Sequence, residues 1–95
     1  MEKSLLKLKD YGVFTFISTS HALKAERVLK NASADFLMMP TPREISTSCG
    51  LAIKVAEDGI GLSHEILNSN RVEIDGVYRV RTINGKTQTE RLYNE

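Results

Sequence analysis

Along the chain, the spacing of hydrophobic positions alternates between the period typical of strands and the period typical of helices. Residues 11–17 are rich in aromatic and β-branched side chains that fall on both faces, which predicts a central β-strand. The hydroxyl side chains of residues 18–20 then offer helix N-caps. Residues 20–31 carry apolar side chains at helical spacing with charged side chains between them, and this pattern predicts a helix.

Two more strands are predicted in the middle of the chain, on either side of a turn. The apolar run 36–39, which ends at Pro40, predicts the second strand, and the run 51–56 predicts the third. Between them, residues 41–44 match a capping box with proline at the first helical position. We therefore expect a single helical turn over about residues 42–46.

The last third of the chain predicts one helix and one hairpin. Asp58 is expected to cap a second helix that runs to about residue 68. Residues 72–81 predict a fourth strand that is bent at Asp75-Gly76. Asn84-Gly85 is a strong signal for a two-residue hairpin turn, so the tail is expected to fold back as an extra edge strand.

The order of these elements, β-α-β followed by β-α-β, predicts an α+β fold. Two right-handed split βαβ units make a ferredoxin-like β-α-β-β-α-β sandwich, with two helices on one face of an antiparallel sheet. Another small α+β arrangement would fit the same order. The expected organisation is an N-terminal tail over residues 1–10, a single domain over 11–83, and a C-terminal hairpin or tail over 84–95. The side chains expected in the core are Val13, Ile17, Val28, Leu29, Leu37, Ile53, Ile66 and Leu67.

Composition and charge limit the classes of function. The chain has 95 residues, enough for one domain with a modest core, and its formal net charge is +1. Lysine and arginine are scattered among the acids, whereas nucleic-acid binding needs them clustered on one face. The sequence shows no signal peptide and no apolar run of about 20 residues, so a cytoplasmic location away from the membrane is expected.

Metal and disulfide chemistry have little support in the sequence. A single cysteine, Cys49, excludes an intrachain disulfide and any multi-cysteine zinc site. The two histidines, His21 and His64, form no recognisable ligand spacing with that cysteine. Neither a metal ion nor another cofactor is therefore expected.

Cys49 is instead the candidate nucleophile of the chain. It follows the small hydroxyl residues 46–48 and directly precedes Gly50. Small neighbours leave a thiol accessible, and loop N–H groups stabilise the thiolate, which is the nucleophilic form. Cys49 is therefore expected to lie partly exposed in a loop. The alternative is a small buried cysteine at the start of a strand, which is a common structural role.

Other residues are candidates for assisting this thiol or for binding a ligand. Arg43 would stabilise the thiolate or bind an anion, although pairing with Glu44 is an equal alternative. His21 follows the first strand, which runs antiparallel to the third, so it could approach Cys49 as a general acid or base; a solvated surface histidine is the more frequent case. The candidates for ligand binding through hydroxyl or backbone groups are Thr41, Ser46, Ser48 and Gly50.

Two segments of the chain carry a resemblance to a known family. They are FTFISTSHALKAE at residues 14–26 and PTPREISTSCGLA at residues 40–52. With them the chain resembles a family of small bacterial proteins described as selenium/sulfur carrier-like, formerly a domain of unknown function. This resemblance implies that sulfur or selenium is carried on the cysteine, which is Cys49 here. The Cys-Pro-x-Pro motif of the better-known sulfur-relay carriers does not occur in this sequence.

Three functions are compatible with these observations. The first is a carrier, more than an enzyme in its own right, that holds a persulfide or selenosulfide on Cys49 and moves it between sulfur- or selenium-donating and accepting proteins. The second is a regulatory module that binds an anion or small ligand through the loop 41–50, with Cys49 incidental. The third is an interaction domain that forms a homodimer through its sheet. A carrier requires Cys49, whereas an anion binder tolerates Cys49→Ser and is favoured if Cys49 is buried.

Overall fold

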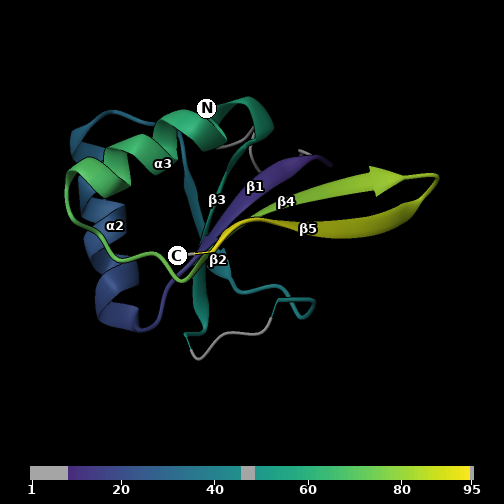
Figure 1. Cartoon of the computed structure of the whole chain (residues 1–95), viewed down its shortest axis with the longest axis horizontal. Helices are drawn as coiled ribbons and strands as arrows, with labels where there is room; N and C mark the ends of the chain where they lie inside the picture. The colour runs from purple at the N-terminus through teal and green to yellow at the C-terminus, as the bar shows by residue number, and fades with distance from the viewer. Residues whose placement is uncertain (1–8, 46–48, 95) are drawn as a thin grey trace.

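The fold consists of one antiparallel sheet with two helices packed on one of its faces (Figure 1). The computed structural model describes residues 9–45 and 49–94. The predicted α+β class, with two helices against an antiparallel sheet, is confirmed. The elements in chain order are β1 (Tyr11–Thr15), α2 (Thr19–Asn31), β2 (Leu37–Pro40), β3 (Leu51–Ala56), η1 (Glu57–Gly59), α3 (Ile60–Ser69), β4 (Gly76–Ile83) and β5 (Lys86–Asn94).

The sheet has five strands in the order β2-β3-β1-β4-β5, whereas the ferredoxin-like prediction has four main strands. The fifth strand, β5, pairs with the outer side of β4. Asn84 and Gly85 join these two strands with φ angles of 53° and 77°. Two successive positive φ values are what a tight hairpin turn of the Asn-Gly type requires. The extra edge strand expected from this dipeptide is therefore present.

Strand β1 lies at the centre of the sheet, and its side chains Val13, Phe14 and Thr15 are fully buried. Phe14 faces Ile53 of β3 on one side and Val77 of β4 on the other. All three are fully buried in the cluster that the helices cover. Burial of each such side chain contributes roughly 1.5–3 kcal/mol to folding. The apolar run that predicted a central strand thus forms the middle of the core.

Helix α2 covers this core with one face. The side chain of Ser18, at the N-cap, accepts a hydrogen bond from the backbone N–H of His21 at 3.4 Å. Such a cap is worth about 1 kcal/mol. Ala22, Ala25 and Leu29 recur at helical spacing and are fully buried. The predicted cap and the predicted apolar face are both confirmed.

Helix α3 begins differently from the prediction. Asp58 lies in the 3-10 turn η1, and the N-cap of α3 is Gly59, which has no side chain to make a cap bond. Ile60 and Leu67 turn inward and are buried. A side chain at Gly12 would overlap the side chain of Ile60. The start of α3 can therefore pack closely on β1 only because position 12 carries no Cβ.

The prediction that Ile17 lies in the core is wrong. Strand β1 ends at Thr15, two residues earlier than expected. Ile17 consequently lies beyond the sheet, in the connection to α2, and its side chain is 49% exposed. The other predicted core residues are fully buried (Val13, Leu29, Ile53, Leu67) or partly buried (Val28, Leu37, Ile66).

The face of the sheet without helices carries a smaller apolar cluster. Its buried members are Val13, Ile45, Ala52, Tyr78 and Val80. Lys54 lies on the same face, with Nζ 4.2 Å from the centroid of the Tyr11 ring. Burial lowers the pKa of Lys54 from its usual 10.5. The long side chain of this lysine covers apolar surface that would otherwise meet water.

Candidate functional site

One residue, Gly50, separates Cys49 from β3, and the side chain of Cys49 is buried. Only 3% of Cys49 is exposed, so the prediction of a partly accessible thiol is wrong. The cysteine belongs to the buried cluster on the helix-covered face, together with Phe16, which follows β1, and Ile74, which precedes β4. The antiparallel order explains this placement, because the start of β3 lies level with the end of β1 and the start of β4. Cys49 therefore packs among residues far from it in sequence.

The sulfur of Cys49 also has polar contacts with the backbone. The N–H of Leu51 donates to Sγ at 3.4 Å, and Sγ lies 3.5 Å from the carbonyl oxygen of Leu51, to which the thiol can donate. A backbone N–H aimed at sulfur favours the thiolate. The site thus combines apolar burial of the thiol with a backbone N–H that donates to its sulfur.

Thr41 closes the loop that leads to Cys49. Its hydroxyl donates to the carbonyl oxygen of Cys49 at 3.0 Å, and its N–H donates to the carbonyl oxygen of Gly50 at 3.1 Å. The N–H of Ile45 donates to the carbonyl oxygen of Pro42 at 3.0 Å, which forms a single turn within the range where one was expected. Thr41, predicted as a ligand-binding residue, therefore holds the two ends of its own loop together.

Arg43 and Gly50 are the other predicted site residues of this loop that the structure describes. Arg43 is exposed, and it makes no ion pair with another of the described side chains. Gly50 is also exposed, and a Cβ there would meet open space, so no close approach requires a glycine. Ser46 and Ser48 lie outside the described residues.

Both ring nitrogens of His21 lie close to side chains other than Cys49. Its Nδ1 lies 2.7 Å from the hydroxyl of Ser18, and its Nε2 lies 3.6 Å from a carboxylate oxygen of Glu73. Both ring nitrogens thus have partners at the start of α2 and in the connection from α3 to β4. His64 packs against Phe14, with the ring centroids 6.3 Å apart.

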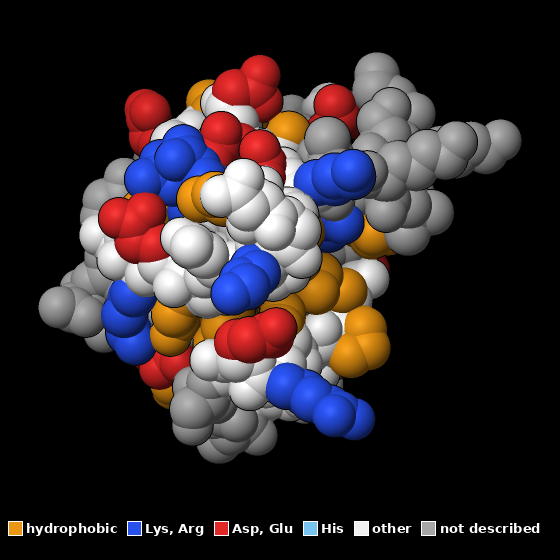
Figure 2. All heavy atoms as spheres, turned by 90° about the vertical axis from the view of Figure 1, so that its right-hand side faces the viewer, with side chains coloured by type: hydrophobic (Ala, Val, Ile, Leu, Met, Phe, Trp, Pro, Cys, Tyr) orange, Lys and Arg blue, Asp and Glu red, His pale blue; other side chains and the backbone are white. Residues whose placement is uncertain are grey.

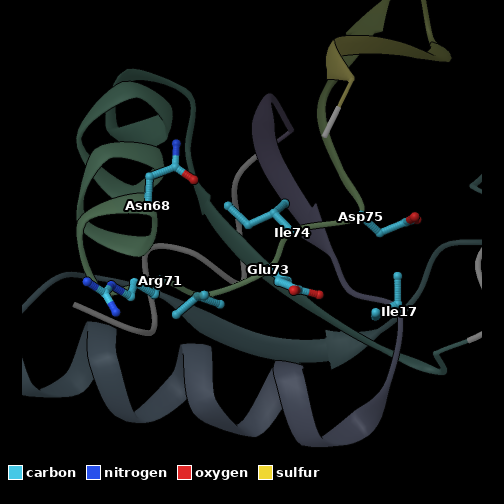
Figure 3. Close-up of a pocket in the computed structure, with 7 residues that line it drawn as sticks. Ile17, Asn68, Arg71, Glu73, Ile74 and Asp75 are labelled. Carbon is cyan, nitrogen blue, oxygen red and sulfur yellow. The ribbon is translucent and has the colours of Figure 1, made fainter.

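A pocket of about 510 Å³ opens at the same end of the sheet as Cys49 (Figure 3). In the close-up, Arg71 extends away from Glu73 and Asp75, and the latter two lie on the side of Ile17. The residue pattern does not reveal this pocket, because its wall is the irregular connection between α3 and β4, which the pattern predicts in part as a strand. The lining residues are Ile17, Asn68, Arg71, Val72, Glu73, Ile74 and Asp75.

The described part of the chain offers no metal site. Across residues 9–45 and 49–94, no group of three or more His, Cys, Asp and Glu side chains is arranged to hold a metal ion. Within the same residues, no helix has both the length and the apolar character needed to cross a membrane.

These features define a small α+β protein with a single cysteine buried at the start of an inner strand. The family model described as "Putative Se/S carrier protein-like" matches residues 11–79, and the chain belongs to this family. The resemblance stated from residues 14–26 and 40–52 is thereby confirmed. The match includes Cys49 and β1 to β3, but β5 lies beyond it. Neither the curated proteins nor the solved structures gave a match to this chain.

Proposed function

We propose that the protein carries a sulfur or selenium atom on Cys49 between a donor protein and an acceptor protein. The observation that supports this most directly is the contact between the Leu51 N–H and Sγ of Cys49, at the only cysteine of the chain and inside the segment that matches the family. We place this exchange in the cytoplasm, where a reducing environment keeps a single thiol reduced. We assign the arrangement of β1 to β4 to the ferredoxin-like sandwich.

The transfer balances without an added oxidant. The thiolate of Cys49 attacks the outer sulfur of a persulfide on the donor, the bond between the two donor sulfurs breaks, and the donor cysteine leaves as a thiolate. Cys49 then holds the persulfide. In the second step a thiolate of the acceptor attacks the outer sulfur, and Cys49 leaves as a thiolate. The Leu51 N–H stabilises Cys49 whenever it is an anion, both as the attacking and as the leaving group.

Burial of Cys49 sets a condition on this function. Because only 3% of Cys49 is exposed, its Sγ cannot reach a partner thiol in this conformation. The donor and the acceptor must therefore each expose Cys49 when they bind. The apolar surroundings then shield the loaded sulfur from water and from unrelated thiols between the two encounters. A carrier with these properties reacts slowly with small reagents and quickly with its partners.

Anion binding by the loop 41–50 is the competing function, and the burial of Cys49 favours it. The described contacts count against it, because the Thr41 hydroxyl and N–H are engaged within the loop itself. Arg43 is the remaining exposed cation of this loop. The two functions differ in their need for sulfur, since only the carrier loses its function in Cys49→Ser.

The test is intact mass spectrometry after incubation with a cysteine desulfurase and L-cysteine. The wild-type protein is expected to gain one sulfur atom, which reduction by a thiol removes, and Cys49→Ser is expected to gain none. The matched control is Cys49→Ser with Thr87→Cys, which places a thiol on an exposed residue of β5. Loading of this control as fast as the wild type would contradict a dedicated site. Unchanged sulfate binding by wild type and Cys49→Ser, with no loading of either, would favour the anion binder.

A further inference from the structure

The two edges of the sheet differ in length and in protection. The edge strand β2 has four residues and ends with Pro40, which lacks a backbone N–H. The opposite edge strand, β5, has nine residues and no proline. Among the described residues, no strand pairs with the outer side of β5. Natural proteins seldom leave so long an edge open, since its backbone groups are ready to pair with another chain.

The outer part of β5 belongs to an arm, formed by residues 81–90, that projects from the body (Figure 1). Strand β1 pairs with β4 only along residues 76–80, so no other strand among the described residues pairs with the arm. All but one of its residues are exposed; the exception, Thr89, is partly buried. Seen from the side on which the arm projects, basic and acidic side chains are interspersed (Figure 2). A partner for this edge must therefore match a mixed pattern of charge.

That pattern is self-complementary. Lys86, Gln88 and Glu90 alternate along β5 and share one face of the strand. Arg79 holds the carboxylate of Glu90 on this face, with Nη2 2.8 Å from Oε1. When two copies of β5 run antiparallel about Gln88, Lys86 of each copy faces Glu90 of the other. Thr87 then faces Thr89, and the two Gln88 amides meet on the axis.

We propose that the β5 edge is the binding site for a second copy of this chain, in the antiparallel register centred on Gln88. The other central registers pair the charges less well. Centring on Glu90 places two carboxylates opposite each other, which is destabilising. Centring on Thr89 places Lys86 opposite Leu92 and forms no ion pair.

The proposed contact closes on itself. A two-fold axis uses the same edge on both copies, so it joins two five-stranded sheets into one of ten strands. The free edges of the joined sheet are then the two β2 strands, which are short and end in Pro40. A dimer, and not an open fibre, is the expected product. Cys49 lies outside this contact, so the dimer proposal does not depend on the carrier proposal.

Charge reversal tests the register directly. Sedimentation velocity over a wide range of protein concentration is expected to show a monomer–dimer equilibrium for the wild type. Lys86→Glu and Glu90→Lys each place like charges opposite each other, and each is expected to raise the dimer dissociation constant about tenfold or more. An equimolar mixture of the two variants restores both ion pairs, and a heterodimer is expected to form with an affinity near that of the wild type.

Three results would overturn the proposal. They are a wild type that stays monomeric at millimolar concentration, single variants that dimerise like the wild type, and a mixture that remains monomeric. Circular dichroism checks that both variants fold. A second measurement uses Cys49→Ser with Gln88→Cys, whose thiols meet on the axis and are expected to form a disulfide-linked dimer under mild oxidation. Ile83→Cys in the same background is the control, because residue 83 lies outside the paired segment 86–90 and its thiols are expected to cross-link far less.

Discussion

The body of the molecule and the projecting arm are stabilised in different ways. In the body, side chains from β1, β3, β4 and both helices meet in one buried cluster, and residues far apart in sequence hold each other in place. In the arm, residues 81–90 are held mainly by the facing strand and the turn at Asn84-Gly85, with contacts to the body from Arg81 to Glu57 and from Thr82 to Asp10. The body is thus specified by long-range packing and the arm by local turn chemistry. Substitutions and chemical probes should therefore affect the two regions to different extents.

The largest expected difference concerns thiol reactivity. Cys49 in the body reacts with iodoacetamide only after local opening, whereas a cysteine introduced by Thr87→Cys in the Cys49→Ser background is always exposed. We expect the arm thiol to react about 100-fold faster or more, because opening of a packed core costs several kcal/mol. Rates measured in denaturant provide the control and should become nearly equal. Similar rates in the native protein would contradict the burial of Cys49.

Stability is the second measurement that separates the two regions. Leu29→Ala removes a fully buried side chain from the body and is expected to lower the free energy of unfolding by about 2–5 kcal/mol. Thr87→Ala changes an exposed residue of the arm and is expected to alter it by less than about 0.5 kcal/mol. Urea denaturation of both variants gives the two values. Equal losses would show that the arm is as important for folding as the core.

Within the arm, the turn itself should be the sensitive point. Gly85 has a φ of 77°, which an alanine side chain adopts only with strain. Gly85→Ala is expected to lower stability by about 1 kcal/mol. Hydrogen exchange is expected to speed up for amides in the arm and to stay unchanged for those of β1. Faster exchange throughout β1 would show that the arm and the body unfold together.

The smallest effect concerns the helix-free face of the body. Burial lowers the pKa of Lys54 below its unfolded value of 10.5, so the unfolded chain binds more protons between the two pKa values. Stability from this group therefore rises with pH through that interval. Lys54→Met keeps the apolar stem and is expected to remove this alkaline rise. Thermal unfolding of wild type and variant between pH 8 and about 10.5 measures the difference, and parallel curves would contradict it.

The sequence predicts features that depend on neighbouring residues better than features that depend on long-range packing. An N-cap among the hydroxyls of residues 18–20 and the Asn84-Gly85 turn were predicted correctly because each depends on neighbours in the chain. Ile17 and Asp58 were misjudged, since the end of β1 and the start of α3 are decided by packing against other elements. Local propensity does not contain that information.

The candidate site shows the same limit more sharply. The small polar neighbours of Cys49 suggested an exposed loop, yet the side chain lies in a cluster with Ile74, which is distant in sequence. The pocket was missed for a related reason, because residues 72–75 line it from an irregular connection. By contrast, the family was correctly inferred, since its motif is continuous along the chain.

The close approach of Gly12 and Ile60 has a consequence for how related sequences can vary. A Cβ at position 12 would overlap the side chain of Ile60 as it is placed. A larger residue at position 12 is therefore best accommodated by a smaller residue at position 60. Among homologues we expect covariation, in which alanine or a larger residue at position 12 accompanies a smaller residue at position 60.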